Sequence, residues 1–201
     1  VEVAARNSPM QTVLSGSREN LESYKEVLEA DGFSVRSVAV EYAFHSELMS
    51  PILEDLEKHA RKFSYNNGNS VRFISTLTGK DLYSEDLSPL YWNLHCREQV
   101  QFQKAIQSLP QKETLFIEIG SASVLLSQAR HTLTESSDLQ HLYCPSLGKS
   151  EDQFLNSLAQ VYSSGKDINW DAFELPETNK VSLPTYPFQR QKYWLEPNSN
   201  I

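Results

Sequence analysis

The chain has 201 residues, 39% of them hydrophobic, and a formal net charge of −8, which fits one folded domain or slightly more. The negative charge argues against a nucleic-acid-binding surface, and no run approaches the roughly 18 apolar residues of a membrane helix. Cys96 and Cys144 lie far apart with no CxxC spacing, so we expect a reducing, cytoplasmic setting. The N-terminus lacks the features of a signal peptide and begins inside an alternating segment, so we expect a chain cut from a longer one.

The first 40 residues alternate between strand and helix signals. Alternation predicts strands at 1–5, 11–15 and 34–40, with a turn at Asn7-Ser8-Pro9 between the first two. Apolar residues at helical spacing predict a helix from about 18 to 30, with Ser17 as its N-cap and Gly32 at its end.

The next segment predicts a helix after His45. Its apolar stripe consists of Leu48, Ile52, Leu56 and Ala60. Pro51 either kinks this helix or lies in its first turn with Ser50 as the cap. Further along, we expect strands at 72–74, 115–119 and 139–144 and helices at 102–109, 124–133 and 151–164. The mainly apolar segment 115–119, which runs into a turn at Gly120, indicates a buried parallel strand, and strands that alternate with helices indicate an α/β fold.

The pattern changes at about residue 165. From there the sequence is rich in aromatic residues and proline and has no helical period. A disordered tail seldom contains so many aromatic residues. We expect an extended strap that packs on a folded surface.

His45 is the first candidate for catalysis. It follows a predicted strand, lies in a short loop and precedes a helix, and active-site groups of α/β folds tend to lie at such strand ends. A histidine there is placed to act as general base for a nucleophile supplied from elsewhere. A structural histidine is the alternative, and spacing alone does not decide between them.

A nucleophile is harder to find, because no Gly-x-Ser-x-Gly elbow occurs in the chain. Gly120-Ser121-Ala122-Ser123-Val124 is the nearest approach, and a turn whose backbone faces a site is its simpler interpretation. Asn7 is by default a turn-former and Arg97 a surface ion-pair residue. No cluster of residues has metal-ligand spacing.

The tail resembles a known segment. Residues 182–194, Ser-Leu-Pro-Thr-Tyr-Pro-Phe-Gln-Arg-Gln-Lys-Tyr-Trp, are similar to the segment that follows acyltransferase domains in type I modular polyketide synthases. Matches to that family run through the chain in family order, among them Ala4-Ala5-Arg6-Asn7-Ser8-Pro9, Ala43-Phe44-His45-Ser46, Tyr91-Trp92 with Arg97, and Phe116-Ile117-Glu118-Ile119-Gly120. The chain therefore resembles the C-terminal half of such a domain, malonyl-CoA:acyl carrier protein transacylase-like, with its trailing linker.

The resemblance implies an α/β-hydrolase-like large subdomain with an inserted ferredoxin-like small subdomain. Residues 1–41 then belong to the small subdomain, 42–164 to the C-terminal part of the hydrolase-like core, and 165–201 to the linker that straps over the domain toward the ketosynthase. Acyl carrier protein and ketosynthase are the implied partners, without nucleic acid or membrane.

The resemblance also implies ping-pong acyl transfer. An elbow serine takes the acyl group from an extender acyl-CoA and passes it to the phosphopantetheine thiol of the acyl carrier protein, with no bound cofactor. The general base of this reaction maps onto His45, and Asn7 maps near the active-site cleft. The elbow serine and the arginine that binds the malonyl carboxylate map upstream of residue 1, so we expect this chain alone to be inactive. In the family a backbone carbonyl from the segment after Gly120 orients the histidine.

The family's selectivity motif includes Phe44. His-Ala-Phe-His marks malonyl selection and Tyr-Ala-Ser-His marks methylmalonyl selection, whereas this chain has Tyr42-Ala43-Phe44-His45. A ring beside the base crowds a 2-methyl group, so we expect malonyl-CoA as the substrate, with Phe44, Tyr42 and Asn7 as substrate-binding residues.

A non-catalytic interpretation stays open. Some synthases are loaded by a separate acyltransferase, and their modules keep shortened acyltransferase remnants as docking or scaffold elements. The Phe44-His45 pair favours an active domain, because a remnant has no chemical need for the base. The turn at residues 120–123 favours the remnant, because it is altered: it has Ser121-Ala122-Ser123 where many members of the family have a His-Pro pair.

Overall fold

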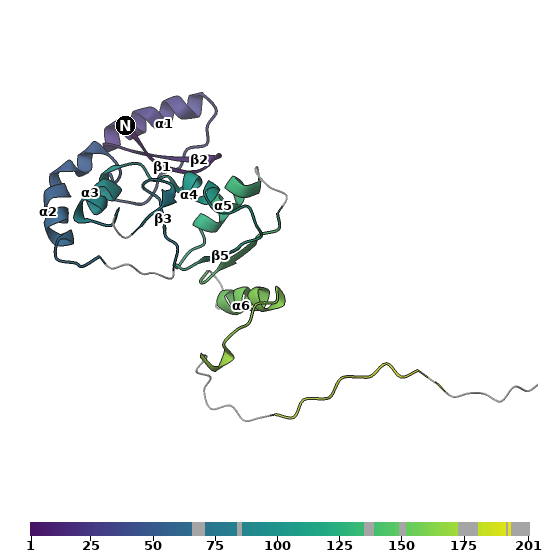
Figure 1. The fold of residues 1–201 in the computed structure, drawn as a ribbon. Helices are drawn as coiled ribbons and strands as arrows, with labels where there is room; N and C mark the ends of the chain where they lie inside the picture. Colours follow the sequence, from purple (N-terminus) through teal and green to yellow (C-terminus); the bar gives the residue numbers. More distant parts are fainter. Residues whose placement is uncertain are drawn as a thin grey trace, which may run out of the picture. The chain divides into compact units, whose positions relative to one another are not determined.

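The computed structural model divides into two compact units, Val1–Lys166 and Asp167–Ile201, and Figure 1 shows its elements. The residues that it describes are 1–65, 71–83, 86–134, 139–148, 152–172, 181–191 and 193. Within these ranges no helix has the length and apolar character needed to cross a membrane.

The first unit opens with an antiparallel hairpin of β1 (Glu2–Ser8) and β2 (Gln11–Ser15). The second strand was predicted with these bounds. The first runs three residues beyond its prediction, and the turn falls on Pro9 and Met10 instead of Asn7 and Ser8. The reason is packing, because Ser8 pairs with Gln11 and is buried, and its hydroxyl donates to the Gln128 side chain at 2.9 Å.

Helix α1 (Arg18–Ala30) confirms its prediction. The Ser17 hydroxyl accepts the N–H of Asn20 at 3.4 Å, and Gly32 ends the helix with a φ of 88°. No residue of α1 is buried. The strand predicted at 34–40 does not form, because no described residue pairs with this segment. Alternation of apolar and polar residues gives a segment one apolar face, but a strand also needs backbone hydrogen bonds to a neighbouring strand.

The helix after His45 has two parts, a 3-10 turn η1 (Glu47–Met49) and helix α2 (Ser50–Ala60). Met49 is the N-cap, so Pro51 lies in the first turn, where its missing N–H costs nothing. Ser50 is not the cap, and its hydroxyl donates to the Glu47 carboxylate at 2.9 Å.

Helix α3 (Pro89–Arg97) packs against α2 and was not predicted. The signal was present, because Ser88 caps the helix by accepting the N–H of Tyr91 at 3.3 Å, and Pro89 occupies the first turn. Beside it lies a short antiparallel pair, β3 (Ile74–Ser75) and β4 (Lys80–Asp81). The strand predicted at 72–74 is thus displaced toward Ser75, whose buried hydroxyl meets the hydroxyl of Tyr91 at 2.9 Å.

The rest of the first unit has the predicted α/β order. Strands β5 (Leu115–Glu118) and β6 (Leu142–Pro145) pair in parallel, as expected. Around them lie α4 (Phe102–Gln107), α5 (Leu125–Thr134) and α6 (Gln153–Ser163), close to their predicted ranges. The expected burial of the 115–119 segment is wrong, since β5 is only half-buried, with Ile117 56% exposed, and Ile119, just beyond the strand, is 90% exposed.

In the second unit, described residues Trp170–Ala172 form a 3-10 turn, η3. Its described residues 181–191 form neither helix nor strand. The rings of Tyr186 and Phe188 lie edge to face, 5.5 Å apart, and both are exposed. Trp194, which closes the family-like segment, lies outside the described residues.

Candidate active site around His45

The backbone of His45 is unusual. Its φ is 62°, in the left-handed region, and no other described non-glycine residue has a positive φ. For a side chain larger than glycine this conformation costs about 1–2 kcal/mol, so surrounding contacts must hold it. One contact is direct, because the His45 N–H donates to the carbonyl of Cys96 at 3.0 Å.

The imidazole of His45 has a defined tautomer. Its Nδ1 lies 2.8 Å from the backbone carbonyl oxygen of Glu98. A carbonyl only accepts hydrogen bonds, so Nδ1 carries the proton and Nε2 of the neutral ring carries a lone pair. No hydrogen bond from the described residues engages Nε2. The ring is therefore ready to accept a proton from a group beside it.

The carbonyl that orients His45 is not the expected one. The family resemblance placed it after Gly120, but it belongs to Glu98, at the end of α3. The segment after Gly120 instead leads into α5. The carboxylate of Glu118 accepts the N–H groups of Val124, Leu125 and Leu126 at 3.0–3.1 Å and so caps α5. The altered turn leaves the orientation of His45 intact.

Arg97 lies between the two residues whose carbonyls hold His45. Its guanidinium donates to one Glu47 carboxylate oxygen from Nη2 at 2.7 Å and from Nε at 3.2 Å. A third donor, Nη1, reaches the Glu2 carboxylate at 3.0 Å. The hydrogen bond from Arg97 lowers the pKa of the Glu47 carboxyl, and the Glu47 N–H, ahead of Arg97, lowers the pKa of Glu2. The predicted surface ion pair is thus a three-residue cluster.

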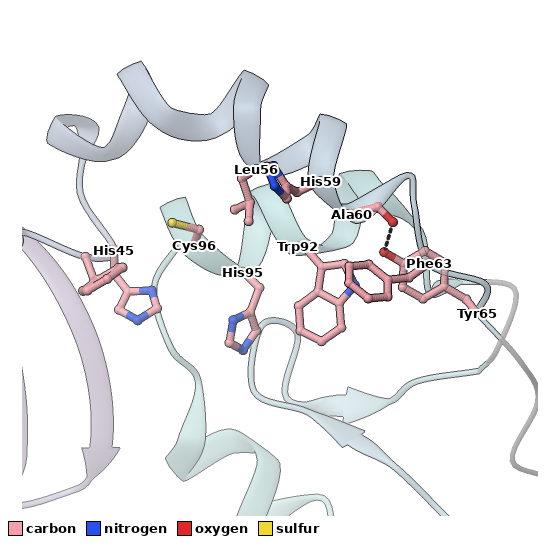
Figure 2. Close-up of a pocket in the computed structure, with 10 residues that line it drawn as sticks. His45, Leu56, His59, Ala60, Phe63, Tyr65, Trp92, His95 and Cys96 are labelled. Atoms are coloured by element: carbon pink, nitrogen blue, oxygen red, sulfur yellow. Dashed lines mark hydrogen bonds between the residues drawn. The ribbon is translucent and has the colours of Figure 1, made fainter.

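A cavity of about 730 Å³ opens beside the His45 ring. Figure 2 shows the rings of His45 and His95 directed into it, the first from the loop before α2 and the second from α3. Its other walls are almost entirely apolar. The lining residues are Phe44, His45, Leu56, His59, Ala60, Phe63, Tyr65, Trp92, His95 and Cys96. Such a cavity suits an apolar group with one polar reacting centre.

Sequence reasoning missed the α3 side of this cavity. The ring of His95 lies 6.3 Å from that of His45, centroid to centroid, and burial and then the proximity of His45 lower the pKa of His95. Burial raises the pKa of the Cys96 thiol, which disfavours the reactive thiolate. The spacing of Trp92, His95 and Cys96 on one turn was the signal that could have placed them on one helix face.

Of the other predicted site residues, one lines the cavity and two do not. Phe44 lines the cavity and stays 45% exposed. Tyr42 does not line it, and its ring lies edge to face with Phe44 at 6.1 Å. Asn7 does not line it either. Its side-chain amide donates to the Gln11 side chain at 3.0 Å. Across the described ranges no three His, Cys, Asp or Glu residues are grouped to bind a metal ion.

Comparison with known proteins identifies relatives of the whole chain. The sequence profile described as "Acyl transferase domain" matches residues 1–166. Polyketide synthase GfsB of Streptomyces halstedii is 36% identical over 98% of this chain, which spans 4% of that synthase. The conidial yellow pigment biosynthesis polyketide synthase of Emericella nidulans is 33% identical over all of this chain, which spans 10% of it. The chain thus corresponds to a small part of each synthase.

Solved structures with a similar fold are also acyltransferases. The acyltransferase domain from the second module of the salinomycin polyketide synthase is 34% identical, with a TM-score of 0.76 over 93% of this chain and 44% of that domain. The malonyl CoA-acyl carrier protein transacylase from Clostridium perfringens shares the fold, with a TM-score of 0.68 at 23% identity over 82% of this chain and 50% of that protein. The chain spans about half the length of these structures.

Proposed function

Because the chain belongs to the acyltransferase domain family of polyketide synthases, we propose that it carries the general base of an acyl transfer from acyl-CoA to an acyl carrier protein. The observation that carries the proposal is the contact between Nδ1 of His45 and the Glu98 carbonyl. It leaves Nε2 as the proton acceptor at the wall of an apolar cavity.

The nucleophile in this proposal is a serine outside residues 1–201, since the chain contains no elbow motif. His45 Nε2 takes the serine proton while the serine oxygen bonds to the acyl carbon. The carbon–sulfur bond to coenzyme A then breaks, and the imidazolium returns the proton to the leaving thiolate. In the second half-reaction the phosphopantetheine thiol gives its proton to His45 and attacks, and the proton goes back to the serine.

Malonyl-CoA is the proposed acyl donor. Phe44 supports this choice, because its ring lines the cavity next to His45, with centroids 6.4 Å apart. A methyl group on the acyl carbon would compete with that ring for space. Tyr42 acts behind Phe44, through the edge-to-face contact of the two rings.

The altered turn at residues 120–123 no longer supports the interpretation of the chain as a non-catalytic remnant. The altered turn at residues 120–123 argued for a disabled base only if that turn oriented His45. The Glu98 carbonyl makes the contact instead, which favours an active domain.

The second unit is proposed as the linker toward the ketosynthase. Tyr186, Phe188 and Tyr193 are exposed and have large apolar faces, and the nearby Pro184 and Pro187 reduce the freedom lost on ordering. Slow amide exchange across 181–194 in the full synthase would support docking, and exchange at random-coil rates would contradict it.

Intact-mass analysis after incubation with malonyl-CoA tests the proposed function. We call the chain joined to the segment that carries the serine the completed acyltransferase. It should gain one malonyl group on that serine, and the 201-residue chain alone should gain none. A malonyl group mapped to a serine within residues 1–201 would overturn the assignment of the nucleophile.

A further inference from the structure

Two short segments hold each other at the candidate base. The first segment, residues 45–47, runs from the His45 loop into the first residue of η1, and the second, residues 96–98, contains the end of α3 and its C-cap. The His45 N–H donates to the Cys96 carbonyl at 3.0 Å, and the His45 ring binds the Glu98 carbonyl at 2.8 Å. Each contact fixes a different part of the same residue, its backbone and its ring.

Arg97 and Glu47 add the third contact between these segments. The guanidinium reaches one carboxylate oxygen of Glu47 with two donors, at 2.7 and 3.2 Å. Arg97 lies between Cys96 and Glu98, whose carbonyls accept the hydrogen bonds of His45, and Glu47 lies two residues beyond His45. The ion pair therefore closes the same junction that holds the base.

Glu2 ties β1 to this junction. One of its carboxylate oxygens accepts Nη1 of Arg97 at 3.0 Å, and the other accepts the backbone N–H of Glu47 at 2.7 Å. All three guanidinium nitrogens of Arg97 are engaged, and its side chain is 22% exposed. The cluster joins three segments that are remote in sequence.

We propose that Arg97, with Glu2 and Glu47, is a positioning residue that holds His45 in its left-handed backbone conformation and keeps its ring on the Glu98 carbonyl. The inference rests on the proposed function of His45. The left-handed conformation is unfavourable for histidine unless contacts maintain it. We expect a loop released from Arg97 to relax toward the extended backbone region, which histidine adopts without this cost, and thereby to lose the contact between the ring and the Glu98 carbonyl. A base misplaced by about 1 Å loses up to 100-fold in rate.

A second ion pair offers a matched control. Arg72 binds Asp81 with two nitrogens, one of them at 2.9 Å, and its side chain is 46% exposed. This pair closes the β3–β4 hairpin and contains the same two chemical groups. Arg72→Gln therefore measures what the loss of an ordinary surface ion pair does to the domain.

The test uses the completed acyltransferase and measures acyl-enzyme formation by rapid quench. Arg97→Gln should lower the maximal acylation rate roughly 10-fold or more, with KM for malonyl-CoA close to wild type. Arg97→Lys should recover part of the rate, because it keeps the charge but not the planar fork. Arg72→Gln should match wild type. A thermal unfolding scan of each variant reports whether the domain remains folded.

The decisive comparison is made in a His45→Ala background. If Arg97 acts only through His45, adding Arg97→Gln there should not lower the residual rate further. An equal effect of Arg97→Gln in both backgrounds, an increase in KM alone, or a rate like that of Arg72→Gln would overturn the inference. Full activity of His45→Ala itself would instead contradict the proposed function.

Discussion

The loop of His45 and helix α1 show two ways in which this chain becomes ordered. Helix α1 has a cap, a glycine stop and a helical apolar pattern, yet none of its residues is buried. The loop of His45 has no regular pattern, yet residues on α3 and β1 hold its backbone, its ring and the following glutamate. Local sequence signals are enough to form helix α1, whereas the conformation of the His45 loop depends on hydrogen bonds from segments that are remote in sequence.

The largest expected effect is a difference in stability between α1 and α3, the helix whose C-terminal end holds the His45 loop. Tyr91 on α3 is 6% exposed, and its hydroxyl meets the buried Ser75, whereas Tyr24 on α1 is 51% exposed. Tyr91→Ala should cost about 3–5 kcal/mol because it empties a packed position, and Tyr24→Ala should cost less than about 0.5 kcal/mol. Urea unfolding of the 201-residue chain measures both. Similar costs would show that α1 is packed as firmly as α3.

The same pair of variants tests what covers α1. In the completed acyltransferase the cost of Tyr24→Ala should rise above about 1 kcal/mol if upstream residues bury that ring. An unchanged cost would mean that α1 keeps its open face in the domain.

The next effect concerns the acyl group in the cavity. Phe44→Ser in the completed acyltransferase should raise the methylmalonyl-to-malonyl ratio of kcat/KM by roughly 10-fold, since it removes the ring beside the base. The change should be partial, because other residues share the wall. Competition between the two acyl-CoA donors, read by intact mass, gives the ratio. Phe33→Ser, outside the cavity lining, is the control, and an unchanged ratio in Phe44→Ser would remove Phe44 from the acyl site.

A smaller effect should depend on pH. Burial lowers the pKa of His95 from its ordinary value of 6.5, so below that value the unfolded chain binds a proton that the folded chain resists. His95 therefore contributes stability above about pH 6.5, and this contribution is lost as pH falls toward its folded pKa. The carboxyls of Glu2 and Glu47, with lowered pKa values, lose theirs only below about pH 4.5.

Unfolding free energies between pH 7 and 5 separate these groups. The decline over that range should be shallower in His95→Gln than in wild type. His131→Gln, on the exposed side of α5, should follow the wild-type curve. Parallel curves for His95→Gln and wild type would contradict the assignment of a lowered pKa to the half-buried His95.

Local signals in the sequence predicted part of the fold. Ser17 and Gly32 marked α1 correctly, and the apolar run at 115–119 predicted a parallel strand. The strand predicted at 34–40 failed because alternation does not reveal whether a partner strand exists. Ser8 was assigned to a turn because its burial depends on Gln128, which lies 120 residues away.

The candidate site was predicted in the same uneven way. The motif around His45 singled out Phe44 and His45, which both line the cavity, and their roles stay a prediction. Glu98 was missed because the contact to Nδ1 of His45 uses a backbone carbonyl 53 residues away, which no side-chain pattern encodes. The ion-pair partners of Arg97 were missed for a similar reason, since Glu2 and Glu47 are ordinary surface residues until the fold brings them together.

The central claim is that His45 is the general base, and one rate tests it most directly. In the completed acyltransferase, the rate of acyl-enzyme formation from malonyl-CoA is measured by rapid quench for wild type, His45→Ala and the control His131→Gln. The account predicts that His45→Ala is slower by roughly 10²–10⁴-fold and that His131→Gln matches wild type. Acyl-enzyme formation in His45→Ala at nearly the wild-type rate would contradict it.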